Sequence, residues 1–161
     1  MSVKIILGID PGLNNTGWGV VKAEGSSLSY IAGGTIKTTT KQTTTERLKT
    51  IHDGFTDLIE KYQPTTAAIE EVFVNENART SLKLGQARGV AILAAGIAGL
   101  ECAEYTPTAI KKAIVGTGRA DKTQIGYMIN MLLPGAKPKT EDAADALAVA
   151  ICHAHTSQNQ F

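Results

Sequence analysis

The amino-acid sequence predicts an α/β protein with a five-stranded mixed sheet flanked by helices. Three observations predict it: the first third of the chain reads as strands, the middle alternates strands with helices, and the last third reads as helices. Strands joined by short turns pair antiparallel, whereas strands joined through a helix pair parallel, so the sheet is mixed. With 161 residues, of which 43% are hydrophobic, residues 1–161 are expected to form a single domain.

The N-terminal third predicts three strands. Residues 3–9 form a nearly continuous apolar run that stops at Asp10-Pro11-Gly12, which is typical of a buried strand that ends in a turn. Residues 17–23 and 28–37 read as two further strands. The short turn between these two strands favours a hairpin.

The middle of the chain alternates helices with strands. After a polar loop at 38–45, apolar side chains at helical spacing predict a helix that ends at Pro64. Residues 66–74 predict the fourth strand, and residues 101–105 predict the fifth. Between them, a long helix is expected from about Ala78 to Ala98, and its glycines would let another backbone approach closely.

The last third predicts three helices, each with a start or stop signal. They are expected from Pro107 to Gly116, from a cap at Asp121 to Leu133, and from a cap at Thr140 to about His155. We interpret the histidines near the end of the last helix as ordinary helix residues, because they lie two turns or more beyond its acidic start.

Composition and charge exclude several classes of protein. Residues 1–10 lack a signal-peptide pattern, and the longest apolar stretch, 90–100, is too short to cross a bilayer. Two isolated cysteines indicate reduced thiols in a cytoplasm, not a disulfide framework or a zinc site. The net charge is only +1, but residues 105–140 hold six basic residues and one acidic residue. Such a stretch suits an anionic polymer, although a solvated helix face would look the same.

Four carboxylates stand in otherwise apolar surroundings. Asp10 ends a buried strand, and Glu70 lies in the apolar run of the fourth strand. Asp142 and Asp145 are three residues apart, so a helix presents them on one face. A carboxylate that loses hydration needs a cation, and no basic residue closely adjoins Asp10 or Glu70 in sequence. Each residue alone also has an ordinary explanation, as a turn former, an edge-strand residue or a first-turn acid.

The combination predicts metal-dependent phosphodiester chemistry. Carboxylate oxygens select hard cations such as Mg²⁺ or Mn²⁺, and two ions about 4 Å apart would stabilise the entering and leaving oxygens of a phosphodiester. Lys111, Lys112 and Lys122 would bind phosphate nearby. Phe73 would stack on an unpaired base, or else pack in the core.

Four sequence blocks resemble one protein family. They are Gly8-Ile9-Asp10-Pro11-Gly12, Ala68-Ile69-Glu70-Glu71-Val72-Phe73, Leu82-Lys83-Leu84-Gly85-Gln86-Ala87-Arg88-Gly89 and Asp142-Ala143-Ala144-Asp145-Ala146-Leu147-Ala148. In this order they resemble the RuvC family of bacterial Holliday-junction resolvases, from about residue 4 to Gln158. The Asp-Pro-Gly turn alone is a weak signal, whereas the four blocks together are highly specific. The resemblance implies a ribonuclease H-like fold.

The resemblance also assigns roles to individual residues. The implied metal ligands are Asp10, Glu70 and Asp145, with Asp142 at a fourth position that some relatives fill with histidine. Lys111 and Lys122 match lysines that contact junction phosphates, and Phe73 matches an aromatic residue that wedges into the opened junction. The helix from Ala78 matches one at the dimer interface of the family. Glu71 departs from the pattern, because relatives often carry a neutral polar residue there.

The implied activity is resolution of four-way DNA junctions by a Mg²⁺-dependent homodimer. The family nicks two strands of like polarity symmetrically, leaves 5′-phosphate and 3′-hydroxyl ends, and works with the RuvA and RuvB branch-migration proteins. Three alternatives stay open from the residues alone. They are an actin-like phosphotransferase, a related nuclease of the same fold, and a DNA-binding dimer without catalysis.

Overall fold

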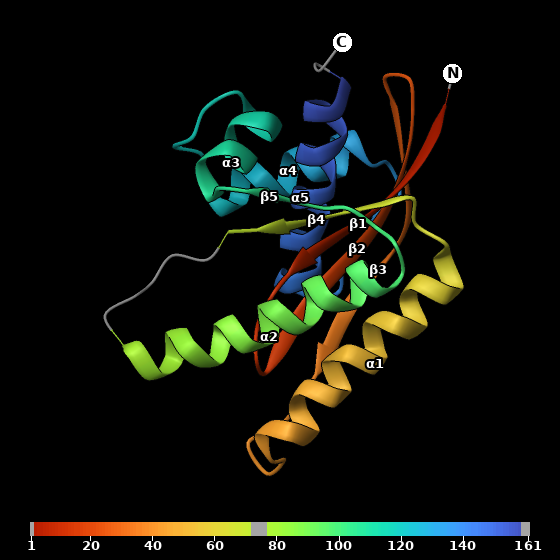
Figure 1. Ribbon diagram of the computed structural model, residues 1–161. Helices are drawn as coiled ribbons and strands as arrows, with labels where there is room; N and C mark the ends of the chain where they lie inside the picture. The colour runs from red at the N-terminus through yellow and green to blue at the C-terminus, as the bar shows by residue number, and fades with distance from the viewer. Residues whose placement is uncertain (1, 72–76, 159–161) are drawn as a thin grey trace.

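The computed structural model describes residues 2–71 and 77–158, which form one five-stranded sheet with helices on both faces (Figure 1). The strands are β1 (Val3–Asp10), β2 (Asn15–Glu24), β3 (Ser27–Lys37), β4 (Thr66–Glu70) and β5 (Cys102–Tyr105). The helices are α1 (Thr44–Tyr62), α2 (Ala78–Ile97), α3 (Pro107–Val115), α4 (Lys122–Leu132) and α5 (Glu141–Gln158). The strand order is β3-β2-β1-β4-β5, antiparallel among the first three strands and parallel where α1 and α2 connect the others. The predicted mixed sheet is therefore confirmed.

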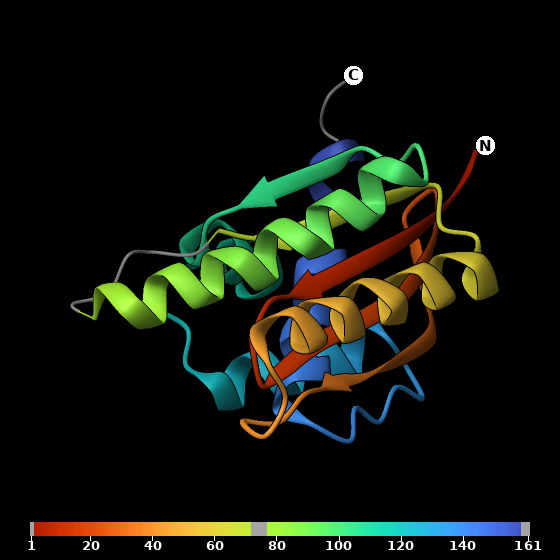
Figure 2. The same cartoon turned by 60° about the horizontal axis from the view of Figure 1, so that its bottom comes forward.

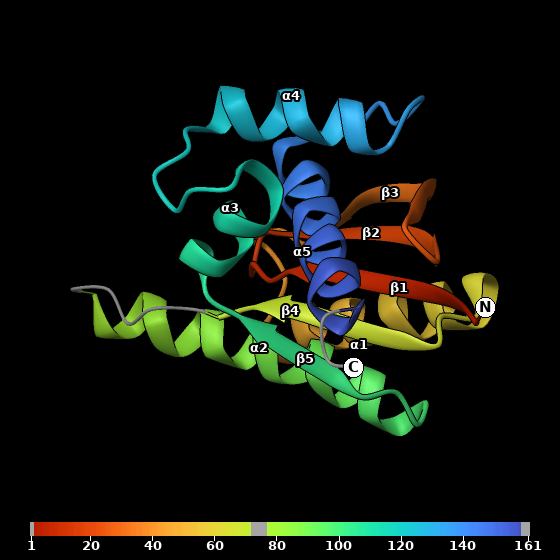
Figure 3. The ribbon, with the colours of Figure 1, turned by 90° about the horizontal axis from the view of Figure 1, so that it is seen from above.

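Two hydrophobic cores lie on opposite faces of the sheet. Alternation along β1 sends Ile6 toward α5 and Leu7 toward α1 and α2. Figures 2 and 3 show α1 and α2 side by side on one face of the sheet. Helix α5 crosses the other face, and α3 and α4 pack on that same side, next to α5. Strand β1 is the central strand of the sheet, paired antiparallel with β2 on one side and parallel with β4 on the other.

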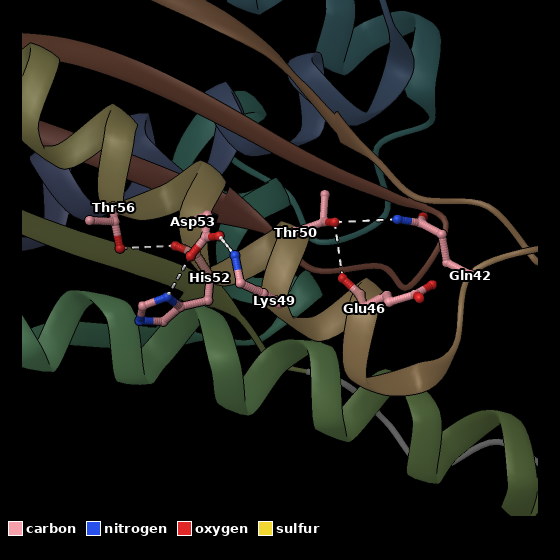
Figure 4. A network of polar contacts seen from close by, with 7 residues as sticks. All are labelled: Gln42, Glu46, Lys49, Thr50, His52, Asp53 and Thr56. Atoms are coloured by element: carbon pink, nitrogen blue, oxygen red, sulfur yellow. Dashed lines mark hydrogen bonds and ion pairs between the residues drawn. The ribbon is translucent and has the colours of Figure 1, made fainter.

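Helix α1 begins and ends with specific caps. Thr43 and Glu46 form a capping box, and Gln63 adopts a left-handed conformation with φ 50° directly before Pro64. Its outer face carries a polar network, in which the Lys49 ammonium pairs with the Asp53 carboxylate at 2.5 Å (Figure 4). This network agrees with a solvated helix face, while Phe55 points into the core.

Some boundaries differ from the sequence predictions. Strand β4 ends at Glu70 instead of residue 74, although the Glu71 amide still donates a hydrogen bond to the Tyr105 carbonyl oxygen at 2.8 Å. Residues 72–76 lie outside the described part of the chain. Helix α2 ends at Ile97, because Gly99 follows with a positive φ of 79° that a helix cannot continue. None of the helices in residues 2–71 and 77–158 combines the length and apolar character of a membrane span.

Candidate active site

Strands β1 and β4 bring Asp10 and Glu70 to the same edge of the sheet. The two strands run parallel with Ile9 beside Ile69, so the next residue of each strand is an acid. Ile6 and Ala68 face the core beneath α5, and period-two alternation places Asp10 and Glu70 on that same face. Both acidic side chains are half-buried.

Helix α5 adds Asp142 and Asp145 above this edge. The Thr140 hydroxyl accepts a hydrogen bond from the Ala143 amide at 3.1 Å and contacts the Thr35 hydroxyl of β3 at 2.7 Å. The cap predicted at Thr140 is therefore present, and it also ties the start of α5 to the sheet. Asp142 lies in the first turn of α5, where the helix dipole favours an anion, and Asp145 lies one turn further.

Three glycines allow α5 to lie directly on the sheet. A Cβ atom at Gly8 would lie 2.1 Å from the Ala146 carbonyl oxygen, and one at Gly17 would lie 2.0 Å from the Asp142 carbonyl oxygen. At Gly19 it would lie 2.6 Å from a methyl group of Leu147. Gly17 is the cross-strand partner of Asp10, so this close packing sets how near the acids of α5 come to β1. The sequence reasoning missed these residues, although glycines at period two along one strand face were a usable signal.

Burial and like charges raise the proton affinity of this acidic cluster. Desolvation raises the pKa of the Asp10 carboxyl to about 8, and the negative charge of Asp145 adds to the effect. Desolvation is also the main cause that raises the pKa of Glu70, again with a contribution from Asp145. The pKa of Asp145 itself is raised, chiefly by burial, although Lys122 opposes the shift. The cluster therefore holds more negative charge than the protein neutralises.

The donor set fits a divalent cation. Within residues 2–71 and 77–158, no ion pair or side-chain hydrogen bond engages Asp10, Glu70, Asp142 or Asp145. In the same part of the chain, no three acidic, cysteine or histidine side chains converge tightly enough to form a ready coordination shell. Like charges repel, so a cation is needed to draw these carboxylates together, and hard oxygen donors suit Mg²⁺ or Mn²⁺.

A cavity of about 670 Å³ opens beside the acids, between α3, α4 and α5. Glu70 and Asp145 line it together with Lys111 and Lys122, while isoleucine and alanine side chains form its apolar wall. The structure thus brings two of the three predicted lysines, Lys111 and Lys122, to the acidic cluster, whereas Lys112 does not line the cavity. Lys122 pairs with Glu141, a residue that the sequence reasoning did not single out. Phe73 lies outside the described residues.

We expect Asp10→Asn to stabilise the metal-free protein at alkaline pH. The folded protein holds the Asp10 proton up to about pH 8, whereas the unfolded chain loses it near pH 4, so the free energy of unfolding falls as pH rises between these values. Removing the charge should raise the free energy of unfolding above pH 8, by at most about 6 kcal/mol for a pKa raised from its ordinary value of 3.8 to about 8, and should flatten this decline. Urea unfolding across the pH range, with Asp57→Asn as the exposed control, measures both effects. If the free energy of unfolding of Asp10→Asn falls as steeply with pH as that of the parent protein, the decline does not come from a buried Asp10 carboxylate repelled by its neighbours.

Solved structures share the fold of this chain. Thermus thermophilus RuvC, in a structure with its Holliday junction substrate, matches with a TM-score of 0.91 and 30% sequence identity, over 96% of this chain and 95% of that chain. The yeast mitochondrial Holliday junction resolvase Ydc2 matches with a TM-score of 0.66 at 14% identity, which supports the fold alone. The sheet order and flanking helices therefore place the chain in the ribonuclease H-like class.

Sequence comparisons identify the family within this class. Residues 6–153 match the family model of the crossover junction endodeoxyribonuclease RuvC. The relative from Azorhizobium caulinodans is 55% identical over 93% of this chain and 89% of its own length. The relative from Sinorhizobium medicae is 51% identical over 95% of this chain and 92% of its own length. The chain belongs to the RuvC family of crossover junction endodeoxyribonucleases.

Proposed function

We propose that the protein is a structure-selective DNA endonuclease that resolves four-way junctions in recombination and repair. The observation that carries this proposal is the set of four neighbouring acids that form no ion pair among the described residues, on a chain of the RuvC family. The T. thermophilus relative that matches most of this chain is described with a Holliday junction as its substrate. Paired symmetric nicks would separate the junction into two duplexes.

Asp10, Glu70, Asp142 and Asp145 would hold two Mg²⁺ ions, for which Mn²⁺ substitutes. When bound, these ions supply charge stabilisation for the pentavalent phosphorus of an in-line displacement. Water attacks phosphorus, the bond from phosphorus to the 3′ oxygen breaks, and the 3′ oxygen takes a proton. This leaves the 5′-phosphate and 3′-hydroxyl ends. The packed strand ends and the start of α5 would position the four carboxylates for this task.

Basic residues at the mouth of the cavity would hold the DNA backbone. Lys111 lies on α3 and Lys122 on α4, so two different elements present positive charge to the phosphates beside the acids. Both lysines oppose the rise in the pKa of Glu70, which places their charges within electrostatic reach of it. Phe73 would wedge into the opened junction, a role proposed from the family resemblance alone.

The exposed face of α2 would form the interface of a homodimer. Leu82, Leu93 and Ile97 are 71%, 56% and 68% exposed and follow one another along one face of the helix. Gly85 and Gly89 lie on the same face, and a Cβ atom at either position would have no other described part of the chain within 4 Å, the backbone of α2 itself apart. This exposed face of α2 therefore has room for a second helix to approach closely, which is the role expected for its glycines from the sequence. Two copies would supply one active site to each cleaved strand.

We expect Leu93→Glu to weaken this dimer by at least about 100-fold, because a carboxylate would lose its hydration in an apolar interface. Sedimentation equilibrium measures the change directly. Met131→Glu is the matched control, because Met131 is an exposed apolar residue of similar exposure, 58%, on α4. A Leu93→Glu protein that stays dimeric, or a Met131→Glu protein that dissociates equally, would exclude α2 as the interface.

The cellular setting is also a proposal. Cys102 and Cys152 are free thiols, and desolvation raises the pKa of both, so neither is an activated thiolate. Reduced thiols and a DNA substrate are compatible with the cytoplasm. There the protein would act with the RuvA and RuvB branch-migration proteins, and co-sedimentation with a RuvA-bound junction tests this partnership.

One assay separates the proposed function from its alternatives. The purified protein is incubated with a synthetic four-way junction, a linear duplex, an RNA–DNA hybrid or ATP, each with and without Mg²⁺. Paired nicks in the junction alone, dependent on Mg²⁺, are expected. Cleavage of the hybrid would favour a related nuclease. Hydrolysis of ATP with no nicking of DNA would favour a phosphotransferase, and binding of DNA with no nicking would favour a DNA-binding dimer.

A further inference from the structure

The turn that follows Asp10 is fixed by polar side chains. The Thr16 hydroxyl donates a hydrogen bond to the Gly12 carbonyl oxygen at 2.5 Å and accepts one from the Gly12 amide at 3.4 Å. The Thr38 amide donates to the Asn14 carbonyl oxygen at 2.9 Å. Strand pairing ends at Asp10 and resumes at Asn15 on the other side of the turn, so these bonds hold the segment between them.

Arg47 completes this network from the first turns of α1. It is only 7% exposed, and its Nε donates to the Thr38 hydroxyl at 3.1 Å while its Nη2 donates to the Asn14 side-chain oxygen. The same Thr38 hydroxyl donates to the Leu13 carbonyl oxygen. Among the described residues no carboxylate pairs with Arg47, so neutral groups of the turn hold a buried charge. A lone buried guanidinium costs desolvation, which makes this position unusual for a purely structural residue.

Hydrogen bonds hold the start of α1, which carries the Arg47 side chain, in a fixed position. The Arg47 amide donates to the Thr43 carbonyl oxygen at 2.9 Å, beside the capping box. Gln42 accepts a hydrogen bond from the Thr39 amide at 2.9 Å and donates to the Thr50 hydroxyl at 3.4 Å, as Figure 4 shows for the second contact. Hydrogen bonds therefore connect the loop before α1, the start of α1 and the turn that follows Asp10.

We propose that Arg47 is a positioning residue that, through the turn of residues 11–14, holds the Asp10 carboxylate in the geometry needed for cleavage. The inference rests on the proposed function, because Asp10 is its object. The planar guanidinium donates to the Thr38 and Asn14 oxygens from two different nitrogens, whereas lysine would have to donate to both from one nitrogen at the end of a flexible chain. The side chain is only 7% exposed, and its Nε and Nη2 already donate to Thr38 and Asn14, so it offers little surface to a DNA phosphate.

The test compares Arg47→Met and Arg47→Lys with Phe55→Leu, a core change on α1 that lowers stability but removes none of the hydrogen bonds that hold the turn. Thr38→Val removes the hydroxyl between Arg47 and Leu13 and serves as the second variant should Arg47→Met fail to fold. Three quantities are measured for each: junction cleavage with kcat and KM separated, Mn²⁺ affinity by calorimetry, and amide exchange in residues 11–16.

Both Arg47 variants should lose about 10- to 100-fold in kcat, bind Mn²⁺ more weakly and exchange faster at the turn, with KM within about threefold. Phe55→Leu should keep kcat within about twofold. Unchanged kcat in Arg47→Met, or an equal loss in Phe55→Leu, would overturn the proposal. So would a rise in KM with a shallower salt dependence, which marks a phosphate contact. If the parent protein cuts no junction, the proposed function fails, and Mn²⁺ affinity with turn exchange still decides the role of Arg47.

Discussion

Asp10→Asn should lower the rate of junction cleavage at least about 10³-fold, while the affinity for the junction stays within about threefold. The substitution keeps the shape of the side chain and removes the charge that a divalent cation requires. Losing a metal ligand from a two-ion centre costs the transition state several kcal/mol, and about 4 kcal/mol corresponds to a factor of 10³. Binding depends on lysines and phosphates instead, so it should survive.

Single-turnover cleavage with Mg²⁺ and a binding titration with Ca²⁺ measure the two effects separately. Asp57→Asn is the matched control, because Asp57 is an exposed carboxylate of α1 without a partner among the described residues. Its cleavage rate should be unchanged. An Asp10→Asn protein that cuts within tenfold of the parent rate would show that Asp10 does not hold the metal.

Gly17→Ala should also disable the enzyme, although Gly17 carries no functional group. The new methyl carbon would lie 2.0 Å from the Asp142 carbonyl oxygen, so α5 must move away from the sheet. Overpacking of this kind costs about 2 kcal/mol of folding free energy, and a displacement of about 1 Å at a reacting centre lowers activity about 100-fold. We expect both losses together.

Gly33→Ala is the control for this prediction. Gly33 also lies in the sheet, on β3, but its added methyl carbon would meet its nearest neighbour at an ordinary 3.5 Å. The Gly33→Ala protein should keep full cleavage activity. Its urea midpoint of unfolding should stay the same or rise slightly, because alanine suits a strand better than glycine. A Gly17→Ala protein that matches Gly33→Ala in both measurements would mean that α5 does not depend on this contact.

Local sequence signals predicted most of the fold. The apolar run before Asp10, the turn at Gly25 and the Asp121 and Thr140 caps each act through neighbouring residues, and the structure has all of them. The end of the fourth strand was wrong, because an apolar run continues past Glu70 while strand pairing stops there. Pairing depends on partner strands, which a single run of sequence does not contain.

The site could be predicted only in part. Asp10 and Glu70 were found because a charged residue in an apolar strand is locally conspicuous, and strand register then brings them together. The approach of α5 depends on glycines that carry no chemistry, and the turn depends on Arg47, which belongs to no motif. Both act through contacts between segments far apart in sequence, so composition and spacing do not reveal them. Asp142 was found by its spacing to Asp145, and Lys111 and Lys122 by the basic stretch that holds them, while the family resemblance assigned their individual roles.

Anomalous diffraction from crystals of the protein grown with Mn²⁺ and a four-way junction tests most directly whether the carboxylates hold divalent ions at the scissile phosphate. We predict Mn²⁺ peaks beside the scissile phosphate, with carboxylate oxygens of Asp10, Glu70 and Asp145 in the coordination shell. A junction bound with no Mn²⁺ between the phosphate and these carboxylates would contradict the proposed mechanism.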